Sequence, residues 1–434
     1  MKAKILSTIA FLVVLVLVSH VAWIVGSVSH RVEQVADGQT MASPPSCYRF
    51  PLLEYFALAH EHVNASLGWA NSGVWSDEGV ILAEWAFQRL VHIPISYGEE
   101  LVVRPIAEEG ILRHVNSDSN SFRNIGDPYF IHRRERTGYL LLVRSSYEAF
   151  RSVFLLNKER EIEQEILTRD HQLTDLTTGD IVVLRDVFQL VPIGSGLLLY
   201  GTVEASFSEQ WFGYIDPSES TYRRFWRATA EHHEYYGMPD HHYMAATADA
   251  AFFLLATEWP RIARVDLPSL EMRILDHFPL DFKVPKVDPG SDRDRQVDIL
   301  YDKYEVYLAA RMAVGLIAWD EKVFIVGKGA AEISGNDSGN DWWLIRISPE
   351  TGEEVSRILL PTKAPHIVLV PGPKFLTIIE KGRIDMVGDY RNATLGRSTL
   401  SGVLLPRADW LDREVTAGAV TCSDLKITGA IYRQ

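Results

Sequence analysis

Hydrophobic and polar residues alternate along most of this chain in short runs, and the runs return in the same order. The clearest stretch, Gly196–Trp226, predicts a strand, a hairpin, a second strand, a tight turn and a third strand. Alternation with a period of two is typical of a strand that is buried on one face. Asp216 and Pro217 suit the turn, because Asp bonds back to the backbone and Pro presets φ. The pattern therefore predicts an all-β fold.

The phrase of strand, polar turn and strand recurs along the sequence. Its clear copies are Ser152–Leu167, Trp211–Trp226, Arg261–Leu275 and Trp342–Leu359, and a weaker fifth runs from Lys374 to Tyr390 and closes on Gly402–Pro406. Further apolar segments lie upstream of each copy, so each unit has four predicted strands. Four-strand units of roughly 40–50 residues are the signature of β-propeller blades. An irregular β-sandwich is the alternative.

At this point the chain resembles the six-bladed β-propeller superfamily that includes NHL-type, gluconolactonase-type and paraoxonase-type proteins. The resemblance covers roughly Gly79 to the C-terminus and depends on the blade pattern, so it implies a fold and says little about activity. Lactonases of this group imply calcium held by Glu, Asn and Asp on inner strands. The expected inner strands Phe188–Ile193, Tyr243–Ala248 and His366–Gly372 are nearly free of acidic residues, which argues against a calcium-dependent lactonase.

The N-terminal region has a different pattern. Lys2 and Lys4 precede an apolar run, Ile5–Val28, that has no charged residue and would span about 36 Å as a helix. This predicts a membrane anchor over 1–30 and a linker over 31–46, with the N-terminus in the cytoplasm and the body outside it, periplasmic or extracellular. A cleaved signal peptide is the alternative, and it places the body in the same compartment.

The rest of the chain is predicted to form one propeller with two helical additions. Apolar residues between Phe50 and Ala70 recur at helical spacing, which predicts an amphipathic helix in an N-terminal segment over 47–78. The propeller then covers 79–434, with a helical insertion over 281–311. We expect the sixth blade to combine strands from Val80–Val115 with Leu425–Tyr432, because strands from both ends would leave no free edge.

The chain has two cysteines, Cys47 near the start of the body and Cys422 near its end. A ring-shaped fold brings its ends together, and paraoxonase-like propellers resemble this arrangement. In an oxidising compartment the pair predicts a disulfide that closes the ring, and two separate buried thiols are the alternative.

The net charge and the absence of known motifs limit the classes of function that the sequence allows. The net charge of −14 and the absence of a Lys/Arg-rich run exclude binding of nucleic acid through phosphate neutralisation. The sequence has no nucleophile elbow, no phosphate-binding loop and no C-x-x-C pair.

Four histidines in Ala230–Met244 form the strongest concentration of candidate chemistry, just before an expected first strand. In a propeller this position is the mouth of the central channel, and other residues share it. The candidate binding residues are Asp127, His132, Asp240, His241, His242 and His366. Imidazole and carboxylate groups can hold a divalent metal or act as acid and base, and His241, His242 and His366 are the metal candidates. A solvent-facing loop without a ligand is the alternative.

The sequence therefore favours a membrane-tethered, extracytoplasmic β-propeller that acts as a binding or scaffold module for a protein, peptide or glycan and needs no cofactor. The alternative is a metal-assisted hydrolase, similar to a lactonase or esterase, with a His/Asp site at the mouth of the channel.

Overall fold

The chain divides into two compact units, Met1–Pro45 and Ser46–Gln434. The computed structural model describes residues 46–51, 70–84, 89–97, 101–103, 127–134, 138–145, 149–203, 210–227, 243–255, 260–267, 269–279, 312–330, 340–364, 366–381, 401–411 and 422–425. None of these residues belongs to a helix long and apolar enough to cross a membrane. The predicted anchor, nearly all of the linker and the helical insertion lie outside the described residues.

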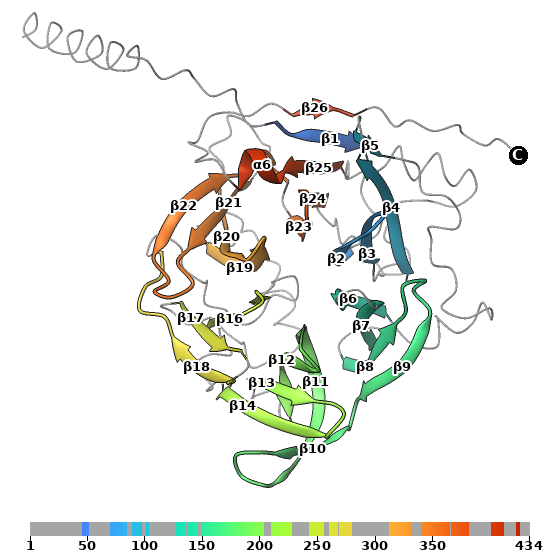
Figure 1. Cartoon of the computed structure of the whole chain (residues 1–434), viewed down its shortest axis with the longest axis vertical. Helices are drawn as coiled ribbons and strands as arrows, with labels where there is room; N and C mark the ends of the chain where they lie inside the picture. Colours follow the sequence, from blue (N-terminus) through green and yellow to red (C-terminus); the bar gives the residue numbers. More distant parts are fainter. Residues whose placement is uncertain are drawn as a thin grey trace, which may run out of the picture. The chain divides into compact units, whose positions relative to one another are not determined.

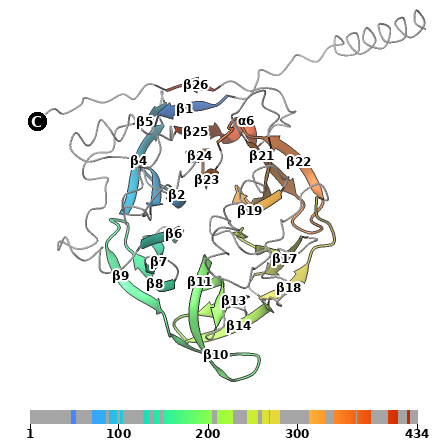
Figure 2. The ribbon, with the colours of Figure 1, turned by 180° about the vertical axis from the view of Figure 1, so that it is seen from behind.

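Within the second unit, six small sheets form the blades of a β-propeller, as predicted (Figures 1 and 2). Blade 1 holds β2 (Ala70–Ser76), β3 (Gly79–Glu84), β4 (Arg89–Tyr97) and β5 (Leu101–Val103); blade 2 holds β6 (Asp127–Arg134), β7 (Gly138–Ser145), β8 (Ala149–Leu156) and β9 (Ile162–Thr168). Blade 3 holds β10 (Gln172–Asp175), β11 (Ile181–Ile193), β12 (Gly196–Val203), β13 (Gln210–Asp216) and β14 (Thr221–Arg227); blade 4 holds β15 (Met244–Ala246), β16 (Ala250–Leu255), β17 (Arg261–Asp266) and β18 (Glu271–Ile274). Blade 5 holds β19 (Met312–Trp319), β20 (Lys322–Ala330), β21 (Asn340–Ile347) and β22 (Glu354–Leu359); blade 6 holds β23 (His366–Pro371), β24 (Phe375–Lys381), β25 (Ser401–Pro406), β1 (Tyr48–Pro51) and β26 (Ser423–Asp424).

The innermost strands make the ring continuous. Strands β2, β6, β11, β15, β19 and β23 contact one another in this order, and β23 contacts β2. Figure 1 shows β9, β14, β18 and β22 at the rim. We call the end of the ring where the innermost strands begin the leading face. The opposite end, where each innermost strand turns into the second strand, is the turn face.

The repeated phrase of the sequence is the outer half of a blade. Its copies form the hairpins β8–β9, β13–β14, β17–β18 and β21–β22, which confirms the predicted strands. The turn chemistry is also as expected: the Asp216 carboxylate accepts a bond of 3.0 Å from the Ser218 N–H, and the Asn157 side-chain oxygen accepts one of 2.8 Å from the Glu161 N–H.

The hydrophobic core lies between the blades. Each cluster of buried apolar residues draws on adjacent blades, such as Leu140 with Leu173 and Tyr222 between blades 2 and 3. A blade is thus buried on both faces by its neighbours, which explains why one repeat cannot fold alone.

Blade 6 closes the ring with residues from both ends of the chain, but not with the predicted ones. Strand β1 pairs antiparallel with β25, and β26 pairs in parallel with β1. Blade 1 is complete without any C-terminal strand, so the expectation that Val80–Val115 joins Leu425–Tyr432 was wrong for its described part. The physical reason is that Phe50 is fully buried against Gly402, where a Cβ would meet the Phe50 ring at 2.1 Å.

The same finding corrects the predicted boundary of the propeller. Both described ends of the segment 47–78 are strands, β1 and β2, so the propeller includes residues before 79. The core of the expected helix, residues 52–69, lies outside the described residues.

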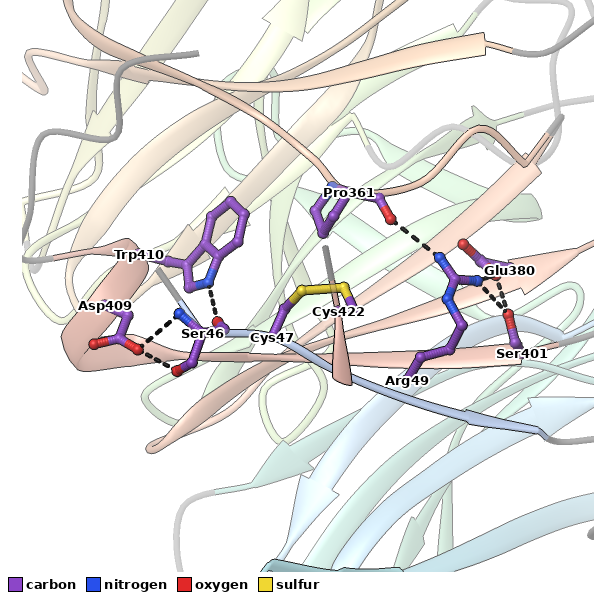
Figure 3. Close-up of a disulfide and its surroundings, with 9 residues drawn as sticks. All are labelled: Ser46, Cys47, Arg49, Pro361, Glu380, Ser401, Asp409, Trp410 and Cys422. Atoms are coloured by element: carbon purple, nitrogen blue, oxygen red, sulfur yellow. Dashed lines mark hydrogen bonds and ion pairs between the residues drawn. A yellow bond between two sulfur atoms is a disulfide. The ribbon is translucent and has the colours of Figure 1, made fainter. Parts of the chain in front are cut away.

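Cys47 and Cys422 form a disulfide, as predicted, beside β1 (Figure 3). Separate contacts hold β1: the Trp410 Nε1–H donates to the Ser46 carbonyl at 2.6 Å, and the Arg49 guanidinium contacts Glu380 at 2.6 Å. Trp410 belongs to α6 (Arg407–Trp410), the short helix that follows β25.

Candidate binding site at the leading face

Two of the candidate residues begin innermost strands. Asp127 is the first residue of β6 and pairs with Arg144 of β7, and His366 is the first residue of β23 and pairs with Lys381 of β24. Both therefore belong to the leading face. His132 lies further along β6, opposite Leu140, so the structure separates it from that level.

The other candidates, Asp240, His241 and His242, lie outside the described residues. The described part of the chain contains no group of three or more His, Cys, Asp or Glu side chains placed to hold a metal ion. A metal site that uses His241, His242 and His366 stays a prediction.

The structure draws attention to a residue that the sequence interpretation passed over, Arg144 at the end of β7. Its guanidinium lies 4.9 Å from the centre of the Tyr129 ring and 5.7 Å from the centre of the Phe188 ring. It also makes an ion pair of 3.3 Å with the Asp186 carboxylate. Tyr129 and Phe188 are on the innermost strands of blades 2 and 3, so Arg144 bridges two blades at the leading face.

Burial makes this arrangement unusual for a charged pair. The Arg144 side chain is 13% exposed and that of Asp186 is 5% exposed. Removing a charge from water costs free energy unless the charge is paired, and the attraction between paired charges is stronger there than at the surface. The pair therefore fixes the guanidinium in place and leaves it a small exposed part.

Irregular pairing of β11 sets the positions of Asp186 and Phe188. The register between β11 and β12 shifts between Leu184 and Asp186 and again between Val187 and Gln189. Such bulges bend a strand and re-aim its side chains. Gly201 permits the first shift, because a Cβ there would meet the Asp186 carbonyl oxygen at 2.2 Å.

A buried polar contact continues the site into blade 4. The Gln189 side-chain oxygen accepts a bond of 2.7 Å from the backbone N–H of Tyr243, which precedes β15. The Tyr200 ring lies 5.4 Å from Phe188 and 5.9 Å from Tyr243. Aromatic rings and one amide thus connect blades 3 and 4 at this end.

Basic residues occupy the same register position in three blades. The position is the one opposite the first residue of an innermost strand. It is held by Arg144 opposite Asp127, by Lys328 opposite Met312 and by Lys381 opposite His366. Lys328 is 6% exposed, and its ammonium lies 5.2 Å from the centre of the Trp342 ring. The sequence signal was present: each of these cations comes near the end of an apolar second strand, as in GYLLLVRS, KVFIVGKGA and FLTIIEK.

No family model matches this chain, and no curated protein sequence matches it. Similar solved structures include an exo-β-1,3-galactanase from Phanerochaete chrysosporium, at 9% identity and TM-score 0.33 over 64% of this chain and 59% of that one. Another, from Thermus thermophilus, is described as an oxidoreductase (glucose dehydrogenase), at 11% identity and TM-score 0.33 over 78% of this chain and 97% of that one. The endosialidase of phage phi92 matches at 8% identity and TM-score 0.39 over 83% of this chain and 69% of that one.

The chain thus spans about 59% of the length of the galactanase. Similarity at this level carries no argument about activity, and the six sheets themselves define the fold.

Proposed function

We propose that this protein is an extracytoplasmic, membrane-tethered β-propeller that binds an acidic glycan at its leading face. The observation that carries the proposal is the Arg144 guanidinium, held between the Tyr129 and Phe188 rings by the buried Asp186 carboxylate. The disulfide supports the compartment, since such bonds persist in oxidising environments. The tether rests on the apolar run Ile5–Val28.

The chemistry of Arg144 favours a carboxylate or sulfate group on the ligand. A guanidinium presents donors in a planar fork that matches such groups, and fixing it in advance lowers the entropy that binding costs. Tyr129 and Phe188 are only partly buried, so apolar ring surface lies beside the charge. Sugar rings carry both polar and apolar faces, which suits such a pair.

The charge distribution supports the same ligand class. The chain carries a net charge of −14, yet the position opposite the first residue of the innermost strand is basic in blades 2, 5 and 6. Basic residues that recur at one end of the ring give an anionic ligand more partners there than the net charge of the whole chain suggests.

Arg144→Lys tests the proposal, because it keeps the charge and removes the fork. We expect binding of uronic-acid oligosaccharides by the full-length protein to weaken about tenfold, the loss of roughly one charge-assisted hydrogen bond. Arg264→Lys is the matched control, since the Arg264 side chain is 12% exposed but belongs to blade 4 at the turn face. Isothermal titration measures both variants.

Neutral oligosaccharides of the same length complete the design. Equal affinity for neutral and acidic sugars would refute the proposal, and so would equal losses in the two variants. If the protein binds an acidic peptide more tightly than every glycan, the ligand is a peptide and the glycan proposal is wrong.

A further inference from the structure

The outer edge of β1 is covered by β26. β26 pairs with β1 in parallel over two residue pairs, Tyr48 with Ser423 and Arg49 with Asp424. The Ser423 N–H donates to the Cys47 carbonyl at 2.9 Å, and the Leu425 N–H donates to the Arg49 carbonyl at 2.7 Å. Leu425 also packs against the apolar cluster between blades 6 and 1. This short segment, Cys422–Leu425, thus pairs with the Cys47 and Arg49 carbonyls along that edge.

β1 does not need this cover to stay in blade 6. Its other edge pairs with β25 over four residues, from Tyr48 with Leu404 to Pro51 with Ser401. The Arg49 guanidinium contacts Glu380 at 2.6 Å, Ser401 at 2.8 Å and the Pro361 carbonyl at 3.2 Å (Figure 3). Removing β26 would therefore leave the ring closed and the outer edge of β1 open.

An open β1 edge would differ from the rim strands of blades 2, 4 and 5. β9, β18 and β22 carry several charged side chains, as in IEQEILT, EMRI and EVSRIL, and such charges discourage the addition of another strand. β1, with the sequence YRFP, has only the Arg49 charge, and that charge is paired with Glu380. Its edge depends on the cover to avoid pairing with another chain.

We propose that the outer edge of β1 is a strand-acceptor site controlled by thiol exchange, and that its partner is the segment Cys422–Leu425 of a second copy of this chain. The edge already fits this segment. Because the chain has two cysteines, exchange between two copies replaces two internal disulfides by two intermolecular ones. Backbone pairing supplies the affinity, as in other cases of strand addition and domain swapping.

The exchange needs only an external thiol as catalyst. Its thiolate attacks the partly exposed Cys422 sulfur, forms a mixed disulfide there and releases the buried Cys47 as a thiolate. A second copy that an external thiolate has opened in the same way supplies its own Cys47 thiolate. This thiolate attacks the Cys422 sulfur of the first copy and releases the external thiol, and the reciprocal attack does the same on the second copy. Two internal disulfides break and two intermolecular ones form, so no net oxidation occurs.

Two single variants isolate the step. Full-length Cys47→Ser and Cys422→Ser chains, tagged to differ in mass, are mixed in a glutathione redox buffer and separated without reductant. The mixed dimer, which joins Cys422 of one chain to Cys47 of the other, should exceed either homodimer at least fivefold. The variant with both cysteines replaced is the control and should stay monomeric. A mixed dimer no more abundant than the homodimers would overturn the proposal.

Wild-type protein provides a second measurement that does not depend on the variants folding. Glutathione should convert part of the monomer into a dimer, and mass spectrometry of its peptides should find Cys47 joined to Cys422 across two isotopically distinct chains. A synthetic peptide Cys-Ser-Asp-Leu should suppress the dimer, whereas Cys-Asp-Ser-Asp should not. No cross-chain bond, or equal suppression by both peptides, would contradict the proposal.

Discussion

The two ends of the ring are built differently from the same blades. At the turn face, bonds between neighbouring blades hold the described turns: the Trp75 indole N–H donates to the Val370 carbonyl at 3.1 Å, and the Trp319 indole N–H donates to the Gly372 carbonyl at 2.9 Å. At the leading face, the Arg144 guanidinium of blade 2 lies near aromatic rings of blades 2 and 3.

The difference indicates that the turn face contributes mainly to stability and the leading face mainly to binding. Contacts at the turn face join secondary structure to secondary structure, so their loss loosens one blade from the next. At the leading face, Arg144 and the partly buried rings of Tyr129 and Phe188 are fixed on strands and are not fully covered. Changes at the turn face should therefore alter the free energy of unfolding, and changes around Arg144 should alter binding.

The largest expected effect concerns the disulfide. Replacing Cys47 and Cys422 by serine removes a link between residues separated by 375 positions. We expect the free energy of unfolding to fall by about 3–5 kcal/mol, because the unfolded chain gains entropy. Denaturant unfolding of the variant and of reduced wild-type protein should give the same value. A loss below about 1 kcal/mol would show that blade contacts alone set the stability.

Gly372→Ala tests the packing of the turn face directly. A Cβ at Gly372 would lie 2.3 Å from the Trp75 ring, and Trp75 is buried between blades 6 and 1. Overpacking of this kind should lower the free energy of unfolding by about 3 kcal/mol. Gly179→Ala is the control: Gly179 has φ of 79° but no atom within 4 Å of its Cβ position, so only backbone strain of about 1 kcal/mol should remain. Equal losses of unfolding free energy in the two variants would show that contact with Trp75 does not cause the effect.

A buried histidine makes the contact between blades 1 and 2 sensitive to acid. Burial, with a smaller effect from Arg160, lowers the pKa of His92 from 6.5 to about 4. Its Nε2 atom has no hydrogen-bond partner among the described residues, nor has the Nε atom of Arg160. The folded state therefore favours neutral His92, whereas the unfolded chain takes up the proton at higher pH.

Stability should fall as the pH drops from about 6.5 to about 4, by up to about 3 kcal/mol in total. His92→Gln should remove this part of the pH dependence, which denaturant titrations at pH 7, 5.5 and 4 would measure. Parallel curves for wild type and variant over this range would contradict the assignment to His92.

Local pattern was enough to predict the blades. Alternation and a polar residue at the start of the turn, such as Asn157 or Asp216, recur in the clear copies, and each hairpin forms through contacts near in sequence. Ring closure was harder, because the four residues of β1 are too few to show a period. Its decisive contact joins Phe50 to Gly402 across most of the chain, and no local rule identifies such a pair.

The candidate site was predicted only in part for a similar reason. The position of Asp127 and His366 at the leading face follows from the sequence, because each stands at the start of an apolar strand. The positions of Asp186 and Phe188 depend on two register shifts in β11, which a strict period of two cannot show. Arg144 could be read as a charge that ends an apolar strand, but its partners Asp186 and Phe188 come from blade 3.

The smallest expected effect makes the contrast between the faces sharpest. Arg264 of β17 contacts Asp266 at 2.6 Å, donates to the Pro349 carbonyl at 3.0 Å and pairs with Glu350 of the next blade. Arg264→Lys keeps the charge and loses part of this fork, so stability should fall by about 1 kcal/mol, since Glu350 is largely exposed. Binding of acidic oligosaccharide should not change. Arg144→Lys should lower the affinity more than the stability, because the lysine keeps the charge beside Asp186. A variant that changes both quantities by similar factors would mean that the two faces are not independent.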